Sequence, residues 1–208
     1  MSVRRPETDG LASWGSSGPF VTVVSGLPRS GTSMMMRMLE AGGMEVVTDG
    51  VRKADEDNPR GYYELERVKR LQEDSSWLRE ARGKALKVIS RLLCYLPSEE
   101  RYKVIFMRRP MDEILASQRK MLERSGKAPD PVADERAAAA FEKHLAQLER
   151  WLLCQRNMEV LYVRYNDVVA GPREWSGVVN RFLGGGLDVD RMASAVEASL
   201  YRQRRQAG

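Results

Sequence analysis

The residues best suited to chemistry lie in segment 26–33, a glycine-rich stretch that contains one arginine and several hydroxyl side chains. A short apolar run, residues 21–24, precedes it, and a Met- and Leu-rich helical pattern follows it. In a strand–loop–helix unit of this kind, successive backbone N–H groups converge on an anion, and the helix N-terminus adds partial positive charge. The segment therefore predicts a site for a phosphate or sulfate group.

The spacing of this loop fits the Walker A frame G-x-x-x-x-G-K-[ST], with one departure. Thr32 stands where that frame has lysine, and the cation of the loop comes earlier, at Arg29. The planar guanidinium of arginine can donate two parallel hydrogen bonds to a phosphate or sulfate, whereas the ammonium of lysine acts as a point charge. We therefore expect a phosphate-bearing ligand that is not bound in the manner of ATP with magnesium. The residues expected to bind it are Pro28, Arg29, Ser30, Gly31, Thr32 and Ser33.

The loop sequence G-L-P-R-S-G-T-S resembles the 5′-phosphosulfate loop of the sulfotransferases that use PAPS (3′-phosphoadenosine 5′-phosphosulfate). The resemblance implies a P-loop NTPase-like fold, PAPS as co-substrate and no metal. It also implies that Arg29 and the loop N–H groups stabilise the charge developing on the 5′-phosphate of the product, PAP (3′,5′-adenosine bisphosphate). The acceptor would be a small molecule or carbohydrate with a hydroxyl or amine, and the sequence does not identify it.

A second segment, residues 104–110, resembles the sulfotransferase 3′-phosphate site, in which an arginine closing a strand and a serine of the next helix bind that phosphate. Here an apolar run ends in Arg108 and Arg109, and Ser117 follows in a helical pattern. Arginine supplies a charge-assisted fork and serine a directional hydroxyl. The family's Arg-x-Pro pattern selects Arg108, although the serine would then be expected at Ala116. We predict Arg108 with Ser117, and keep Arg109 as the second candidate and a surface arginine pair as the alternative.

A third segment, residues 58–64, reads N-P-R-G-Y-Y-E and is similar to a motif of bacterial and carbohydrate sulfotransferases. Sulfuryl transfer to a hydroxyl needs a general base, and we predict that Glu64 fills this role beside Tyr62 and Tyr63. The alternative is an acidic residue that stabilises the first turn of the helix that follows. The one histidine, His144, lies between apolar positions of a long helical pattern, and we interpret it as a helix-face or core-edge residue.

Three further features are weaker. Sulfotransferases often close over the 3′-phosphate with a basic C-terminal segment, and Arg202 with Arg204 could act so here; a solvated basic tail is equally consistent. Lys87 interrupts an apolar strand pattern; it could face the crevice, and we favour the interpretation that it lies at a sheet edge. Residues 165–167 resemble the family's Y-E-D-L segment, and we predict a structural role for them at the start of a helix.

Composition and length indicate the number of domains, the class of partner and the cellular location. The 208 residues predict a flexible leader, residues 1–19, and one domain, residues 20–208. A net charge of +5 is too modest for a nucleic-acid partner and suits a small polyanion. No apolar run approaches the roughly 20 residues of a membrane span. Two cysteines without metal or disulfide spacing favour a cytoplasmic location.

Apolar runs alternate with amphipathic patterns along the chain. This order predicts an α/β fold with a doubly wound parallel sheet of four to five strands and helices on both faces. The carboxyl ends of the strands would then meet at one crevice. The expected strands are 20–25, 45–47, 86–89, 103–107 and 160–163, and the expected helices are 31–41, 63–82, 110–123, 135–155, 171–182 and 188–200.

A metal-dependent nucleotide or metabolite kinase is the alternative function. Such an enzyme should have a lysine in the loop and an aspartate that ends a core strand to hold magnesium. The expected core strands 103–107 and 160–163 are instead followed by Arg108 and Arg164. The remaining candidate is Asp49, which follows a short apolar run. A nucleotide-binding protein without catalysis is a third hypothesis, and the activity of a Glu64→Gln variant would separate it from the first.

Overall fold

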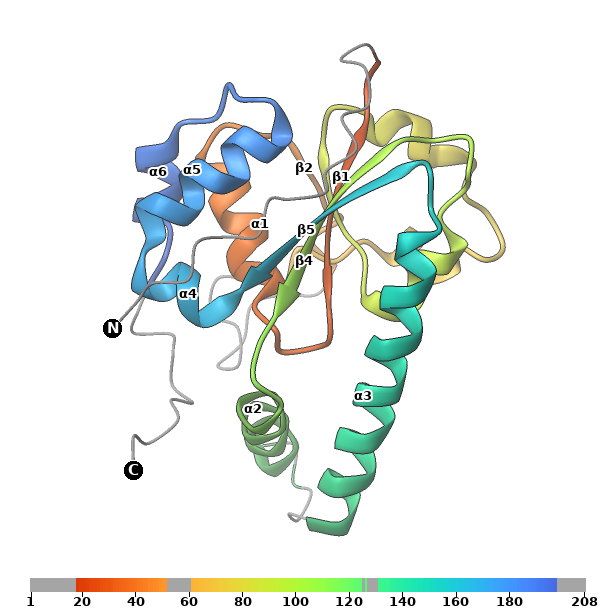
Figure 1. The fold of residues 1–208 in the computed structure, drawn as a ribbon, viewed down its shortest axis with the longest axis vertical. Helices are drawn as coiled ribbons and strands as arrows, with labels where there is room; N and C mark the ends of the chain where they lie inside the picture. The colour runs from red at the N-terminus through yellow and green to blue at the C-terminus, as the bar shows by residue number, and fades with distance from the viewer. Residues whose placement is uncertain (1–17, 52–60, 125, 127–130, 198–208) are drawn as a thin grey trace.

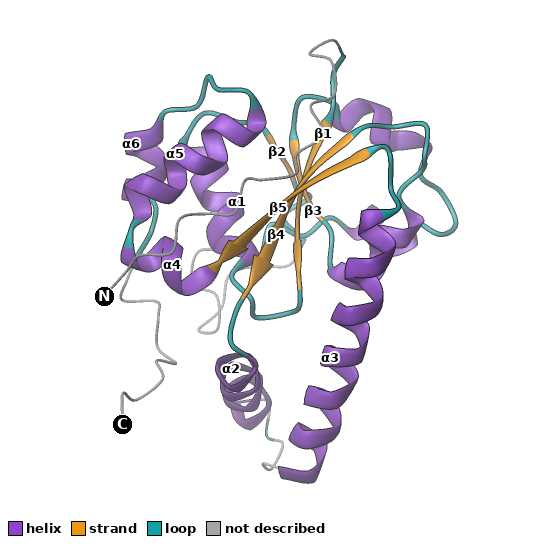
Figure 2. Ribbon diagram, viewed as in Figure 1, coloured by secondary structure: helices purple, strands orange, loops and turns teal. Residues whose placement is uncertain are grey.

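A parallel sheet of five strands forms the centre of the computed structural model, which describes residues 18–51, 61–124, 126 and 131–197 (Figures 1 and 2). The strand order is β2-β3-β1-β4-β5, and every neighbouring pair is parallel. This confirms the predicted doubly wound α/β fold. The strands are β1 (Val21–Gly26), β2 (Val46–Val47), β3 (Ala85–Lys87), β4 (Tyr102–Arg108) and β5 (Met158–Arg164).

Helices cover both faces of the sheet, because alternate side chains of the central strands enter two separate hydrophobic clusters. Val24 and Ile105 pack with α1, α4, α5 and α6, whereas Val23 and Val104 pack with the 3₁₀ helices and α3. The helices are α1 (Thr32–Ala41), α2 (Met111–Arg124), α3 (Pro131–Leu153), α4 (Tyr165–Ala170), α5 (Pro172–Leu183) and α6 (Val189–Ser194), and the 3₁₀ helices are η1 (Glu66–Arg70), η2 (Ser76–Ala81) and η3 (Ser90–Tyr95).

The helix predicted over residues 63–82 is wrong, because this stretch forms η1 and η2 with a turn between them. The side chain of Asp74 accepts hydrogen bonds from the backbone N–H and the hydroxyl of Ser76, a local arrangement that competes with helix continuation. Trp77 and Leu78 are buried in the core beyond this turn. Tertiary burial, not helical periodicity, therefore places the apolar residues of this stretch.

Two helix ends also differ from the predictions. The long helix α3 begins at Pro131 and not at residue 135, which fits the preference of proline for the first turn of a helix. The last helix, α6, ends at Ser194 and not at residue 200. Its start is fixed by Asp188, whose carboxylate accepts hydrogen bonds from two first-turn N–H groups.

The carboxyl ends of the strands point toward the part of the molecule where α2 and α3 extend beyond the sheet (Figure 1). Loops from different parts of the sequence therefore gather at this end. Most of the predicted leader, residues 1–17, lies outside the described residues. In the parts of the chain that the structure describes, no helix combines the length and the apolar character needed to cross a membrane.

We predict that Leu78→Ala lowers the free energy of unfolding by about 2–5 kcal/mol, because the fully buried side chain leaves a cavity in the core beneath η2. The neighbouring variant Arg79→Ala is the control, since that side chain is 77% exposed, and its effect should stay within about 0.5 kcal/mol. Urea unfolding of both variants measures the difference. Equal effects would contradict the placement of η2 against the sheet.

Candidate active site

The glycine loop between β1 and α1 is tightly folded at the carboxyl end of the sheet. Arg29 has a φ of 70° and Gly31 a φ of 100°, both in the left-handed region. A Cβ atom at Gly31 would lie 2.4 Å from the ring of Tyr165, so only glycine fits at this position. The N–H groups of Thr32 and Ser33 open α1, and they are the donors that an anion at a helix N-terminus uses.

A cavity of about 570 Å³ opens against this loop. Its walls come from the loop and α1, from residues 62–69, from β3 and η3, and from α2 and α3. Ser30, a residue of the same loop, is buried and is not among the lining residues. The predicted site residues that the structure brings together around the cavity are Pro28, Arg29, Gly31, Thr32, Ser33, Glu64, Arg109 and Ser117.

Arg29 connects the glycine loop to α2. Its Nε donates a hydrogen bond of 2.9 Å to the hydroxyl of Ser117, which is buried on the cavity side of α2. The two residues are 88 positions apart in the sequence. The loop and the predicted 3′-phosphate segment therefore belong to one site.

Arg108 and Arg109 point in different directions at the end of β4. A guanidinium nitrogen of Arg108 donates to Glu149 of α3 at 2.6 Å, and its Cζ lies 4.1 Å from the ring centre of Tyr162. Arg109 lines the cavity, and its Nη1 donates to the backbone oxygen of Arg29 at 3.2 Å. Consecutive residues of a strand face opposite sides, which explains the divergence. The structure thus brings Arg109 together with Ser117 and places Arg108 against α3.

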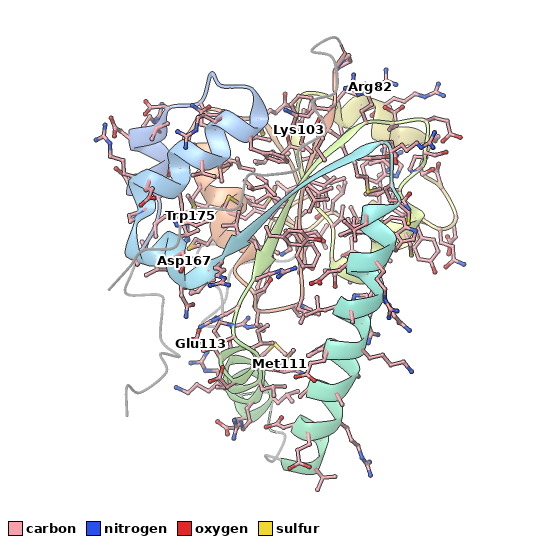
Figure 3. All side chains as sticks on the ribbon, in the orientation of Figure 1. Arg82, Lys103, Met111, Glu113, Asp167 and Trp175 are labelled. Atoms are coloured by element: carbon pink, nitrogen blue, oxygen red, sulfur yellow. The ribbon has the colours of Figure 1, made fainter. Side chains whose placement is uncertain are left out.

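Glu113, Asn166 and Tyr165 form a cluster that fixes the position of the Arg109 side chain. Glu113, on the side of α2 that faces α4 (Figure 3), accepts a hydrogen bond from Arg109 Nε at 2.8 Å and one from Asn166 at 3.0 Å. The side chains of Arg109 and Glu113 are only 8% and 3% exposed. Tyr165 lies under the guanidinium, with its ring centre 4.5 Å from Cζ, and burial raises the pKa of its hydroxyl.

Glu113 is not among the residues predicted for the site, although its spacing from Arg109 indicates a contact between them. Arg109 and Glu113 are four residues apart at the start of a helix, the spacing at which opposite charges meet. The segment containing Tyr165 and Asn166 was predicted to be structural, and in the structure it packs against Gly31 and supports Arg109 through Glu113. It acts on the site through these neighbours.

Lys87 was interpreted as a sheet-edge residue, and this is wrong. Its strand, β3, lies between β2 and β1, and the side chain is buried in the cavity wall. Its Nζ donates to the backbone oxygen of Tyr62 and, at 3.4 Å, to the hydroxyl of Ser33. It also lies 3.7 Å from a carboxylate oxygen of Glu64. A buried cation thus joins the glycine loop to the predicted base.

Glu64 is positioned by its backbone as well as by Lys87. Its carbonyl oxygen accepts hydrogen bonds from the hydroxyl of Thr48 and the N–H of Asp49. Its side chain is 23% exposed and lines the cavity. The first-turn acid of the following 3₁₀ helix is Glu66, so the helix-stabilising alternative belongs to that residue. Residues 58–60 of the predicted motif lie outside the described residues.

His144 lies away from the cavity lining, on α3. Its Nε2 is 2.9 Å from the hydroxyl of Ser90, and burial, with a smaller contribution from Arg91, lowers the pKa of the imidazole. This placement agrees with its interpretation as a core-edge residue.

The charge of the cavity lining is strongly positive. Among the described residues, its carboxylates are Glu64 and Glu197, and its seven cations are Arg29, Arg37, Lys69, Lys87, Arg109, Lys120 and Arg124. Asp49, the one strand-end aspartate considered for a kinase, instead accepts hydrogen bonds from the N–H groups of Val51 and Glu66, which lower the pKa of its carboxyl. The predicted residues Arg202 and Arg204 lie outside the described residues.

Residues 21–207 match the family model of the sulfotransferase domain, and the chain therefore belongs to the sulfotransferase family. Membership of this family makes the protein a group-transfer enzyme by class. Among curated proteins, none matches the chain.

Solved sulfotransferase structures share the fold at low sequence identity. The sulfotransferase domain from the curacin biosynthetic pathway is 12% identical, with a TM-score of 0.51 over 93% of this chain and 94% of that one. Mouse sulfotransferase SULT7A1 complexed with PAP is 14% identical, with a TM-score of 0.54 over 88% of this chain and 63% of that one. Sulfotransferase STF1 from Mycobacterium tuberculosis H37Rv is 16% identical, with a TM-score of 0.51 over 86% and 71%.

We predict that Glu113→Gln lowers the free energy of unfolding by about 3–5 kcal/mol, because it leaves the buried Arg109 without its counter-charge. Glu149→Gln is a matched control, since Glu149 pairs with Arg108 at the same strand end but both side chains are about 40% exposed. Its effect should stay below about 1 kcal/mol. Urea unfolding compares the two variants, and equal losses would show that burial does not distinguish these ion pairs.

Proposed function

We propose that this protein is a PAPS-dependent sulfotransferase, which transfers a sulfuryl group from PAPS to a hydroxyl or amine of an acceptor and releases PAP. The observation that carries the proposal is the hydrogen bond between Arg29 and Ser117, two residues that line one cavity and that we propose bind the anionic groups of the donor. PAPS carries phosphate groups at separate positions of its ribose, the 5′ and the 3′ positions. A glycine loop and a separate Arg109–Ser117 pair fit such a ligand better than a linear triphosphate.

The residues at the loop fit the donor by charge and shape. Arg29 and the N–H groups of residues 30–33 would bind the phosphosulfate, and Arg109 with Ser117 would bind the 3′-phosphate. Gly31 leaves room for the loop to close against Tyr165. Arg202 and Arg204 are proposed to add positive charge near the 3′-phosphate. We propose that residues 20–208 act as one domain, and the solved mouse relative with PAP supports the choice of donor.

Glu64 and Lys87 are proposed to carry out the transfer together. Glu64 accepts the proton of the acceptor hydroxyl, and Lys87, 3.7 Å away, orients that carboxylate. Lys87 also contacts Ser33 of the loop, so its charge lies where negative charge develops on the leaving phosphate. Stabilising charge at the place where it develops is usually the largest catalytic contribution.

We predict that Arg109→Ala weakens PAP binding by about 10- to 100-fold, because it removes a charged hydrogen-bonding group from the cavity. Ser117→Ala should weaken binding less, by about threefold to tenfold. Arg108→Ala, which removes the same charge from the side facing α3, should change the affinity by less than about twofold. Calorimetric titration with PAP measures all three. A larger loss for Arg108→Ala than for Arg109→Ala would assign the 3′-phosphate to Arg108.

We predict that Glu64→Gln lowers the turnover of sulfate from labelled PAPS by about 10²- to 10⁴-fold while the affinity for PAP stays within about threefold, since a general base contributes to the chemical step. The control is Glu66→Gln, because Glu66 is exposed, pairs with Lys69 and does not line the cavity. Normal turnover in the Glu64 variant would refute the base assignment and leave the family assignment intact.

A further inference from the structure

The cavity has two chemically different sides. The donor side consists of the glycine loop with Lys87, Arg109 and Ser117. A second part of the lining forms what we call the acceptor wall, which is built from the end of the 62–69 segment, residue 89, η3, α2 and α3. Its apolar members are Leu65, Val68, Ile89, Leu92, Met121 and Phe141.

The acceptor wall begins beside the proposed chemistry. Ile89 follows Lys87 by two residues in extended chain, so that both side chains lie on the same side, and both line the cavity. Ile89 is 41% exposed, so it presents apolar surface to the cavity that it lines. A molecule whose hydroxyl reaches Glu64 would therefore lie across apolar surface.

Apolar side chains make up most of the wall. Among the described residues lining it, Gln118 is the one neutral side chain of α2 with hydrogen-bonding capacity, and the charged groups of α2 are Lys120 and Arg124. A sugar needs a partner for each hydroxyl that it buries, and the six apolar side chains supply none. The lining therefore favours an acceptor with an apolar body.

Positive charge lies at the far end of the same wall. Lys120 and Arg124 are exposed cations four residues apart on α2, and both line the cavity together with Met121. Arg124 comes seven residues after Ser117, which corresponds to about 10 Å along a helix. An anionic group of a ligand that reaches this part of α2 would be attracted to the two cations.

We propose that the acceptor is an amphiphilic hydroxy acid, with its hydroxyl at Glu64 and Lys87, its apolar chain on the acceptor wall and its carboxylate or other acidic group near Lys120 and Arg124. This inference rests on the proposed sulfotransferase function. The acceptor oxygen forms a bond to sulfur, and the bond from sulfur to the 5′-phosphate oxygen of PAPS breaks with its electron pair leaving on PAP. The hydroxyl proton passes to Glu64.

The test uses three hydroxyl compounds of equal chain length that differ in charge: ω-hydroxydecanoate, α,ω-decanediol and (ω-hydroxydecyl)trimethylammonium. Transfer from labelled PAPS is measured for each. We expect kcat/KM for the acid to exceed that for the diol by about tenfold, the effect of one favourable charged contact, and the cationic compound to be the poorest acceptor.

Variants of α2 show whether Lys120 and Arg124 cause this preference. The double variant Lys120→Gln with Arg124→Gln should reduce the preference for the acid over the diol to less than about threefold. Arg119→Gln is the matched control, because Arg119 precedes Lys120 on the same helix but pairs with Asp134 of α3 at 3.3 Å and does not line the cavity. It should keep the wild-type preference.

The outcomes separate this inference from the function on which it rests. If the wild-type protein fails to bind PAP, the proposed function is wrong. If it binds PAP but sulfates none of the three compounds, or sulfates the acid and the diol equally well, the acceptor proposal alone is overturned. A preference for the acid that survives in the double variant would also overturn it.

Discussion

The site depends on one constraint: the glycine loop must be held against the start of α2. Arg29 makes this connection twice, because its Nε donates to Ser117 and its backbone oxygen accepts from Arg109. These two contacts connect the loop to the residues that follow β4. With them, the two elements face one cavity at the carboxyl end of the sheet, where ligands of doubly wound folds bind.

The fold supports this constraint with buried charge. Arg109 is paired with Glu113, and Glu113 is in turn bound by Asn166 at the start of α4. Burying an ion pair is costly, so such a pair contributes more to a fixed geometry than to net stability. Lys87 is a second buried charge that fixes the geometry of the site, because it contacts both Ser33 of the loop and Glu64. Arg109 and Glu64, to which we assign binding and catalytic roles, are thereby each held by a neighbour from a different element.

The sequence predicted those parts of the site that are local. The glycine loop could be read from its own residues, and Ser117 from its helix. The choice between Arg108 and Arg109 depends on which face of β4 meets Glu149, a contact with a helix more than forty positions later in the chain. Lys87 was misread because the order of strands in a sheet is not a property of the local sequence.

We propose that the glycine loop, Arg109 and α2 bind a nucleotide with separate 5′ and 3′ phosphates. The most direct measurement is a calorimetric titration of the unmodified protein with PAP and, separately, with ATP, each with and without magnesium. The account predicts that PAP binds tightly and that magnesium does not change its affinity. Binding of ATP only with magnesium, together with no heat from PAP, would contradict the account and indicate a metal-dependent kinase.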